Sequence, residues 1–513
     1  MLRHKSKITS LALAALLFAG TGCSKFLDER DPSNLTPDNF YTIPQHADAA
    51  IASVYAQTRF IVGGANIISI NYQMADALTG IASTESAQNS DLNNLLGLAH
   101  DAGNQHIINW WNGLYNVIAQ ANLVLDKVPG INPMDEATKN KILGQAAFLR
   151  AWAYFYAVQY WGDVPLILKP QTATSEDFLP TRTPASAVYD QIVLDLKAAE
   201  GAGLPWTDAT GRVSQAAAKA LLAKVYLTMA GFPLNKGAEY YKLAADKAKE
   251  IINNPGTINL FPDYLSIHTP SKKNTVEHIF QIQFVAGIAS NNDMQILYLP
   301  NFKPITAYTA NFGTTVPIPQ FYNSYEAGDK RTKDREGYFY TTYFQGGYGA
   351  SYDLGAPYIF KHFDVVANGS PGVPGTANSS LNQPQIRFAD VLLIYAEAQN
   401  EVGGPDQSTV DALKRIRDRA GLSTPAVGSF TKESFREAVW RERWYELAYE
   451  NILWFDMIRT RKVFNVTTKG FDDFVGHINL STNKPLAEKH LLLPLPRPEM
   501  QNNPNLQPQN PGY

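Results

Sequence analysis

Aromatic residues gather in one region of the sequence, residues 255–385, where helical periodicity is lost. The rings in this region that a ligand could reach are Tyr298, Tyr308, Phe312, Tyr338, Tyr340, Tyr343, Tyr348 and Tyr352. A flat ring can stack on the apolar C–H face of a pyranose while neighbouring polar groups bind the sugar hydroxyls. We expect two or three of these rings to contact a ligand and the others to pack the loops against helices.

Polar residues that could bind the edge of such a ligand lie in an earlier loop-rich stretch, residues 63–103. This stretch has many small polar residues and little periodicity, and loops of this length are usually functional or disordered. Its candidate ligand-binding residues are Asp76, Glu85 and Asn89. Most of the eight tryptophans, in contrast, follow helical spacing and are assigned to the core, while Trp206 lies in a loop and is left open.

The sequence gives little support for catalysis. It contains no HExxH, GxSxG, Walker or GxGxxG motif in the required context, so we predict no catalytic residue. His100 and His106 lack a third ligand at metal spacing, and we predict no metal site. The adjacent acids Asp472 and Asp473 could imitate the two carboxylates of a glycosidase, but nothing in the sequence places two acids across a cleft. A loop-bound calcium ion is left open without a supporting ligand pattern, and no other cofactor is expected.

The N-terminus has the features of an export signal. Residues 1–7 are basic, residues 8–19 are apolar but too short to span a bilayer, and the small residues 20–22 precede Cys23. Because Cys23 is the only cysteine in the chain, it cannot form an internal disulfide. The segment resembles a bacterial lipoprotein signal, in which this cysteine becomes the lipidated first residue. Gly20 departs from that signal, which usually has an apolar residue there.

The element that must position the loops is a helix within residues 142–168. Between residues 142 and 161 the only charged residue is Arg150. This stretch has two apolar stripes at helical spacing, whereas a surface helix has one, so neighbours must cover it on two sides. Arg150 is then a buried cation that needs a carboxylate partner. A helix covered on both flanks is typical of stacked helical repeats.

The sequence therefore predicts a mostly α fold, a tetratricopeptide-like helical-repeat scaffold with a loop-rich insert that contains a little β-structure. Two successive helices within residues 214–254 occupy roughly 40 residues, near the period of tetratricopeptide-type repeats. Short strands are predicted at residues 279–284 and 358–366. Further helices are predicted at residues 46–60, 105–128, 136–161, 184–200, 387–402, 409–420 and 431–462.

The expected domain organisation begins with a signal peptide at residues 1–22 and a lipid-anchored tether at residues 23–45. A single domain, residues 46–513, follows. Its parts are a scaffold at about residues 46–254 and 386–465, a ligand-binding insert at about residues 255–385, and an extended C-terminal segment at residues 490–513. The prolines of that last segment exclude helix and favour an extended path over the helical body.

Several longer motifs resemble those of a known family. They are RAWAYFYAVQYWGDVPLIL (residues 150–168), RVSQAAAKALLAKVYL (212–227), IRFADVLLIYAEAQNEVGG (386–404), LKRIRDRAGL (413–422) and RERWYELAYENILWFDMIRTRK (441–462). In this order, and over nearly the whole mature chain, the sequence resembles the SusD/RagB family of outer-membrane glycan-binding lipoproteins. The resemblance implies a cell-surface location, a lipid anchor in the outer membrane and a SusC-like TonB-dependent transporter as partner. Ligand sites in this family lie in variable loops, so no binding residue is carried over and starch is not assumed as the ligand.

Three functions remain to be separated. The first is non-catalytic capture of an oligosaccharide or polysaccharide and its delivery to the transporter for nutrient uptake. The second is capture of a peptide or another nutrient by the lid mechanism that the resemblance implies, in which the lipoprotein covers the transporter and closes the captured molecule into it. The third is an exported all-α glycoside hydrolase. Nucleic acid is excluded as a partner, because the formal net charge is −3 and no basic run or basic helix face stands out.

Overall fold

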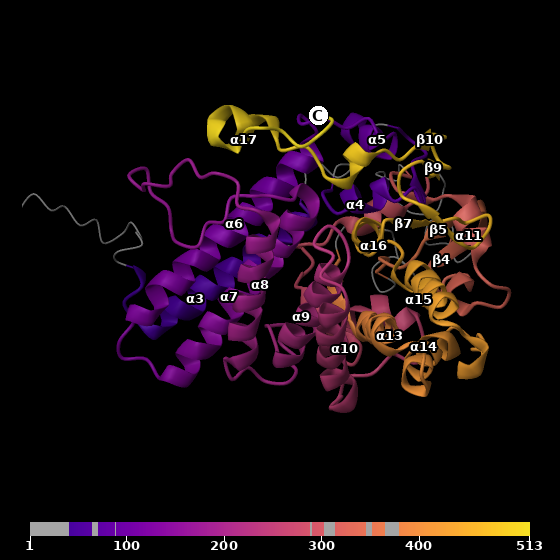
Figure 1. Cartoon of the computed structure of the whole chain (residues 1–513), viewed down its shortest axis with the longest axis horizontal. Helices are drawn as coiled ribbons and strands as arrows, with labels where there is room; N and C mark the ends of the chain where they lie inside the picture. Colours follow the sequence, from indigo (N-terminus) through magenta and orange to yellow (C-terminus); the bar gives the residue numbers. More distant parts are fainter. Residues whose placement is uncertain are drawn as a thin grey trace, which may run out of the picture.

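The computed structural model describes residues 40–63, 70–87, 89–287, 290–301, 313–344, 351–364 and 379–513. Within these ranges the protein consists mainly of α-helices, with short two-stranded sheets on one side (Figure 1). The predicted lipidation site Cys23 and the candidate binding residues Tyr308, Phe312 and Tyr348 lie outside the described residues.

Helices from the first half of the chain stack side by side and form one half of the molecule (Figure 1). Their neighbours in sequence are also neighbours in space, as in tetratricopeptide-type repeats. These helices are α3 (Pro44–Thr58), α6 (Gln105–Lys127), α7 (Glu136–Trp161), α8 (Ala185–Gly201), α9 (Gln215–Ala230) and α10 (Ala238–Asn253). The predicted mostly α, repeat-like scaffold is therefore confirmed.

Helix α7 lies at the centre of this stack, and nearly all of its C-terminal half is buried. Its buried cation Arg150 donates to both carboxylate oxygens of Asp195 on α8, with N–O distances of 2.7 and 2.8 Å. A third bond, 2.8 Å long, runs from Arg150 Nη1 to Asn122 Oδ1 on α6. The prediction of a buried, carboxylate-paired arginine is confirmed, and this one side chain joins three helices.

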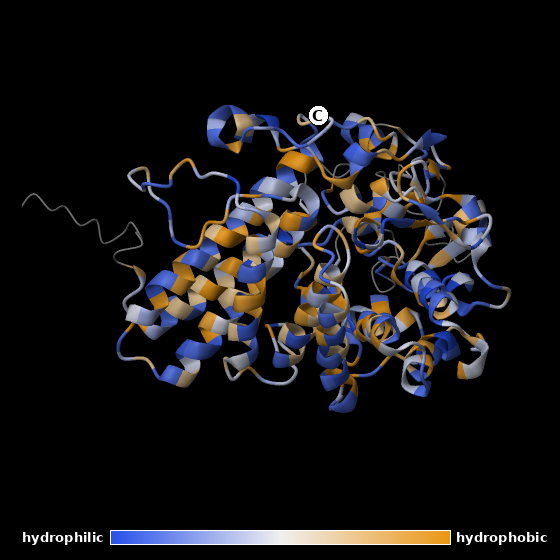
Figure 2. Cartoon of the chain, viewed as in Figure 1, coloured by the Kyte–Doolittle hydropathy of each residue, from blue (hydrophilic) through white to orange (hydrophobic). Residues whose placement is uncertain are grey.

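Helices α9 and α10 differ in burial, because α9 lies inside the stack and α10 lies at its solvent-exposed edge. Most residues of α9 are buried, because it is contacted by α8, α10 and α13 (Phe388–Gly403). In α10 only Ala244, Ala245, Ala248 and Ile251 are buried. Figure 2 shows the corresponding hydrophilic residues on α10, at the lower edge of the molecule.

A second group of helices comes from the C-terminal half of the chain, namely α13 (Phe388–Gly403), α14 (Gln407–Arg419), α15 (Lys432–Leu447) and α16 (Leu453–Thr460). The prediction of one continuous helix over residues 431–462 is wrong. Tyr449 and Asn451 adopt left-handed backbone angles, with φ of 62° and 60°, and separate α15 from α16. Lys361 Nζ donates to the carbonyl oxygens of Glu446 and Ala448, at 2.7 and 3.0 Å. In a continuous helix, backbone N–H groups of the next turn would donate to these oxygens. A contact from the insert therefore stabilises the break.

The insert contains antiparallel strand pairs. Strand β2 (His278–Ile282) pairs with β6 (Gln383–Arg387), and β4 (Phe339–Phe344) pairs with β5 (Ser351–Ile359). The strand predicted at residues 279–284 corresponds to β2. The strand predicted at residues 358–366 is placed wrongly, because β5 ends at Ile359 and the next residues turn toward α15.

Smaller elements connect the insert to the rest of the molecule. Strand β1 (Ala82–Ser83) pairs with β3 (Val316–Pro317), so that the early loop region and the insert share one sheet. The remaining elements near this junction are α4 (Gln73–Leu78), α5 (Ser90–Leu96), α11 (Pro319–Ser324), β7 (Lys462–Phe464), β8 (Phe471–Asp473), β9 (Ile478–Asn479) and β10 (Lys484–Pro485).

The C-terminal segment lies on the helical body, as predicted. The backbone N–H of Leu493 donates to Tyr160 O at 2.7 Å, and Trp161 Nε1 donates to Pro494 O at 3.0 Å. The expectation that prolines exclude helix from this segment is wrong, because α17 (Arg497–Asn502) is a short helix. Its proline lies in the first turn, where a backbone N–H is not needed for helical bonding.

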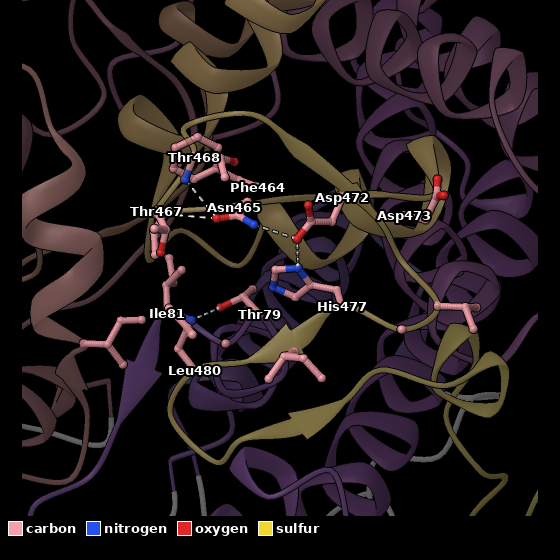
Figure 3. A pocket seen from close by; sticks show the side chains of 16 residues that line it. Thr79, Ile81, Phe464, Asn465, Thr467, Thr468, Asp472, Asp473, His477 and Leu480 are labelled. Atoms are coloured by element: carbon pink, nitrogen blue, oxygen red, sulfur yellow. Dashed lines mark hydrogen bonds and ion pairs between the residues drawn. The ribbon is translucent and has the colours of Figure 1, made fainter.

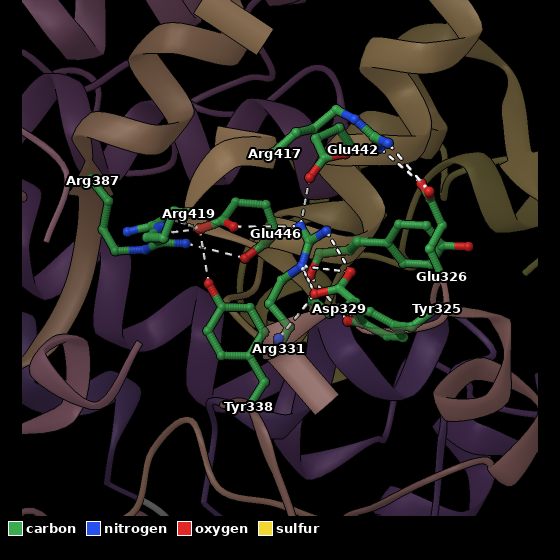
Figure 4. A network of polar contacts seen from close by, with 12 residues as sticks. Tyr325, Glu326, Asp329, Arg331, Tyr338, Arg387, Arg417, Arg419, Glu442 and Glu446 are labelled. Atoms are coloured by element: carbon green, nitrogen blue, oxygen red, sulfur yellow. Dashed lines mark hydrogen bonds and ion pairs between the residues drawn. The ribbon is translucent and has the colours of Figure 1, made fainter. Parts of the chain in front are cut away.

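A buried network of charged side chains joins the insert to α14 and α15 (Figure 4). Glu446 on α15 accepts from Arg419 Nη2 at 2.6 Å, from Arg387 Nη1 at 3.1 Å and from the Tyr338 hydroxyl at 2.8 Å. Arg331 Nη1 lies 3.5 Å from the other oxygen of the same carboxylate. Because each charge has several partners, the network offsets part of the cost of burying it.

Within the described ranges, we find no helix whose length and hydrophobicity would let it cross a membrane.

Candidate functional site

Four of the predicted ligand-binding rings belong to the core. They are at most 2% exposed, namely Tyr298, Tyr338, Tyr340 and Tyr343. The Tyr340 hydroxyl donates to Tyr298 O at 2.6 Å, and Tyr340 and Tyr343 pack in a separate hydrophobic cluster with Phe363. The prediction that these rings contact a ligand is corrected, because none of them offers a face to solvent. Tyr352 lies at the edge of the same cluster and is half-buried.

Glu85 is a predicted binding residue that does face solvent. Its carboxylate accepts from the Tyr358 hydroxyl at 2.6 Å and from the backbone N–H of Asn301 at 2.8 Å. The Glu85 N–H in turn donates to Gly313 O at 2.9 Å. Burial, and then the hydrogen bond to Glu85, raise the pKa of Tyr358, so its hydroxyl stays a donor. Glu85 therefore ties the early loop region to the insert at the surface.

The other two polar candidates have structural roles. Asp76 in α4 is buried, and its carboxylate lies 3.4 Å from the backbone N–H of Asn451 in the break between α15 and α16. Burial raises the pKa of Asp76 to about 7. Asn89 is the N-cap of α5, where its side chain accepts from Leu92 N at 3.1 Å. Asp76 is out of a ligand's reach in this structure, which corrects its assignment as a binding residue.

A pocket of about 500 Å³ opens next to the β1–β3 pair (Figure 3). We call it the polar pocket. One wall consists of the connection between α4 and β1, together with Ile318 after β3. The opposite wall is the segment that contains β7, β8 and the start of β9. The side chains that face it with polar groups are Thr79, Asn465, Thr467, Thr468, Asp472 and His477.

Asp472 is the polar centre of this pocket. Its Oδ2 accepts from Asn465 Nδ2 and lies equally close to His477 Nδ1, each at 2.9 Å. Asn465 Oδ1 accepts from the backbone N–H groups of Thr467 and Thr468, at 3.0 and 3.1 Å. This chain of bonds fixes the carboxylate and the imidazole ring. Within the described residues, Asp472 Oδ1 has no hydrogen-bond partner and is free to accept from a ligand.

The neighbouring acid does not form a carboxylate pair with Asp472. Asp473 points away from it in Figure 3, and its carboxylate lies 2.6 Å from Lys462 Nζ. In the described ranges, no group of three or more histidine, cysteine or acidic side chains could hold a metal ion. The polar pocket therefore contains one oriented carboxylate, that of Asp472.

The rim of the polar pocket is apolar. Val475, Ile478 and Leu480 line it and are 56%, 42% and 45% exposed. Aliphatic side chains left in water beside oriented hydrogen-bonding groups match the two surfaces of a sugar ring, an apolar face and a hydroxyl edge. The pocket therefore offers both an apolar and a hydrogen-bonding surface to a hydroxylated ligand.

Asn465 and His477 were not predicted as site residues. Asp472 was considered only as half of an acidic pair. The sequence does contain a local signal, since Asn, Thr, Asp and His are concentrated in residues 465–477, shortly after α16. What the sequence lacks is any indication that this segment faces Thr79, which lies far earlier in the chain.

Comparison with known proteins identifies the family. A structure described as a SusD superfamily protein from Parabacteroides distasonis superposes with a TM-score of 0.85 and 36% sequence identity, covering 94% of this chain and 100% of that one. The chain belongs to the SusD family. Family models agree in both halves: "SusD family" matches residues 321–513, and "Starch-binding associating with outer membrane" matches residues 25–227.

Further relatives in the SusD family cover nearly the whole chain. The SusD-like protein P2 of Formosa agariphila is 29% identical over 99% of this chain and 100% of its own length. A laminarin-binding SusD-like protein of known structure is 25% identical, with a TM-score of 0.71 and coverage of 92% of this chain and 100% of that one. The resemblance to the SusD/RagB family is therefore confirmed.

Proposed function

We propose that this protein is a non-catalytic, lipid-anchored protein of the outer membrane that binds oligosaccharide or polysaccharide. It then delivers the glycan to a TonB-dependent transporter for uptake. The observation that supports this most is membership of the SusD family over nearly the whole chain, together with the laminarin-binding relative at 25% identity. The description of the matching family model, starch-binding and associated with the outer membrane, points the same way.

The polar pocket is the proposed glycan site. Asp472 and His477 supply oriented hydrogen-bonding groups, and the exposed aliphatic rim supplies an apolar surface. Glu85, two residues after β1, is a further exposed polar group and accepts a hydrogen bond from Tyr358. Buried rings such as Tyr340 stabilise the insert behind this surface and take no part in binding.

Native gels that contain laminarin, xyloglucan or starch test the proposal on the mature form, residues 24–513. We expect retardation in at least one of these gels, and loss of that retardation in Asp472→Ala. The absence of retardation in every gel, combined with unchanged nutrient uptake after deletion of the gene, would contradict glycan capture.

Two alternatives are tested in parallel. Peptide capture predicts that a casein digest binds the protein when no glycan does. An all-α glycosidase predicts release of reducing sugar from a retained polysaccharide, and loss of that release when one carboxylate is mutated. The single oriented carboxylate of the polar pocket favours binding over hydrolysis, because glycosidases use two.

The anchor and the partner need separate experiments. Cys23→Ala should release the protein from the membrane fraction, whereas persistent membrane association would contradict lipid anchoring. The wild-type protein, extracted with mild detergent from its own outer membrane, should co-purify with a β-barrel transporter.

A further inference from the structure

A second pocket lies on the scaffold, far from the insert. It has a volume of about 590 Å³ and lies between α6, the connection from α7 to α8, and α17. It shares no lining residue with the polar pocket. In Figure 1, α17 lies above α6 at the upper left, whereas β9 and β10 lie at the upper right. We call it the amide pocket, because asparagine and glutamine supply most of its polar groups.

Helix α6 contributes two parallel rows of side chains to this pocket. Trp111 and Tyr115 are four residues apart and form a ring pair with centroids 4.8 Å apart. Asn112 and Asn116, one position further along, have the same spacing and are exposed. Side chains at this spacing lie on one face of a helix. Among the described residues, neither asparagine side chain has a hydrogen-bond partner, so both amides are free to bind a ligand.

The opposite wall presents an apolar surface to solvent. Phe178 and Leu179 are 53% and 44% exposed, although large apolar side chains are normally buried. The loop that contains them is held by the C-terminal segment. Asn505 Nδ2 donates to Leu179 O at 2.7 Å, and Asn503 Nδ2 donates to Pro180 O at 2.8 Å. The exposed ring is therefore fixed beside the amide row.

The charges of the amide pocket favour a neutral ligand. Its described lining residues include no lysine or arginine, so no cation is present there to pair with a uronate or a phosphate. The only acid among these lining residues is Glu499. Burial raises the pKa of the Glu499 carboxyl, and a hydrogen bond from Trp111 opposes that shift. The Glu499 carboxylate would repel an acidic sugar, and no lysine or arginine of the pocket lining would offset that repulsion.

We infer that the amide pocket is a second saccharide-binding site, specific for a neutral glycan that stacks on Phe178 while its hydroxyls bind Asn112 and Asn116. The inference rests on the proposed glycan-binding function and adds a second point of attachment to it. A polymer long enough to reach both pockets can occupy them together, whereas an oligosaccharide too short to reach both occupies one at a time. When one polymer binds at two sites, its apparent affinity rises although the affinity of each individual site is unchanged.

The test compares four proteins in native gels with laminarin, xyloglucan and starch, and in calorimetry with laminarihexaose. They are the wild type, Asn112→Ala/Asn116→Ala, Phe178→Ala and the control Gln120→Ala. Gln120 continues the row of Asn112 and Asn116 on α6, but lies one turn outside the amide pocket and is half-buried. For the polymer that retards the wild type, we expect each of the two pocket variants to lower the apparent affinity by about 10-fold or more, because only one of the two linked sites remains. The control should match the wild type.

The outcomes separate the two proposals. If the wild type binds a polymer and both pocket variants bind it equally well, the second site is refuted and the proposed function stands. If a casein digest displaces the polymer from the amide pocket and laminarihexaose does not, the saccharide assignment is overturned in favour of peptide. If the wild type binds no glycan, both proposals fail together.

Discussion

Arg331 Nη1 lies 2.7 Å from Glu442 Oε1, and this ion pair joins the loop-rich insert to α15 with both side chains at most 1% exposed. The same guanidinium bonds to Asp329, from Nη2 to Oδ2 at 2.7 Å (Figure 4). Buried charges are costly unless they are paired in this way. The position of the insert, and with it the surface near the polar pocket, therefore depends on this pairing.

Arg331→Met should destabilise the protein severely. Among the described residues, removal of Arg331 leaves the buried carboxylate of Asp329 without a cation, whereas Glu442 keeps its ion pair with Arg417. Loss of one partner from a buried ion pair costs about 3–5 kcal/mol. The free energy of unfolding from urea titration is the measurement. The matched control is Lys242→Met, which breaks the pair with Asp246 whose side chains are 64% and 56% exposed. Exposed pairs contribute about 0–1 kcal/mol. Equal losses in the two variants would contradict this account.

Stability should fall in acid because of Glu446. Burial alone would raise its pKa, but Arg419, Arg387 and Arg331 outweigh burial and lower the pKa from 4.5 to about 2. A depressed pKa stabilises the folded state above the unfolded value, and this contribution is lost as the pH falls from about 4.5 toward 2. Glu446→Gln cannot titrate, so its urea midpoint should change less than that of the wild type between pH 6 and pH 3. An equally steep dependence in the variant would assign the acid sensitivity to other carboxylates.

The helical scaffold could be predicted because its signals are local. The two apolar stripes around Arg150 specify a helix covered on both sides, and α7 has the predicted bounds. The partner of this cation was predicted as a type, a carboxylate, but not as Asp195. Local spacing determines which face of a helix is buried, whereas the identity of the neighbour depends on how helices stack.

The binding surface could not be predicted in the same way. Tyr340 looks like an available ring in the sequence, but its hydroxyl bonds to Tyr298 O, 42 residues away. A sequence does not show which aromatic residues of an insert pack against one another. The polar pocket depends on Thr79 and Asp472 lining the same cavity, and no local pattern in the sequence indicates that these two segments come together.

Tyr340→Phe separates packing from ligand contact. The variant keeps the ring and loses the 2.6 Å hydrogen bond to Tyr298 O, so Tyr298 O loses its donor. A hydrogen bond of this kind contributes about 1 kcal/mol. We expect that loss in the free energy of unfolding, while retention in the glycan gel that retards the wild type stays unchanged. Weaker retention with an unchanged free energy of unfolding would indicate that Tyr340 contacts the ligand after all.

Asp472→Asn and Asp473→Asn form the sharpest pair of variants for the polar pocket. Both remove one negative charge, and the residues are adjacent in β8. Asp472 is oriented into the pocket by Asn465 and His477, whereas the Asp473 side chain is 81% exposed and points away.

We expect Asp472→Asn to weaken glycan binding by about 10-fold or more, since a hydrogen bond to a charged group contributes about 1.5–3 kcal/mol. Asp473→Asn should bind like the wild type. The dissociation constant for laminarihexaose, or for whichever oligosaccharide matches the retained polymer, is the measurement. If the two variants weaken binding equally, the effect is one of net charge and the polar pocket is not the site. If only Asp473→Asn weakens it, the ligand lies on the outer side of β8, beside Lys462.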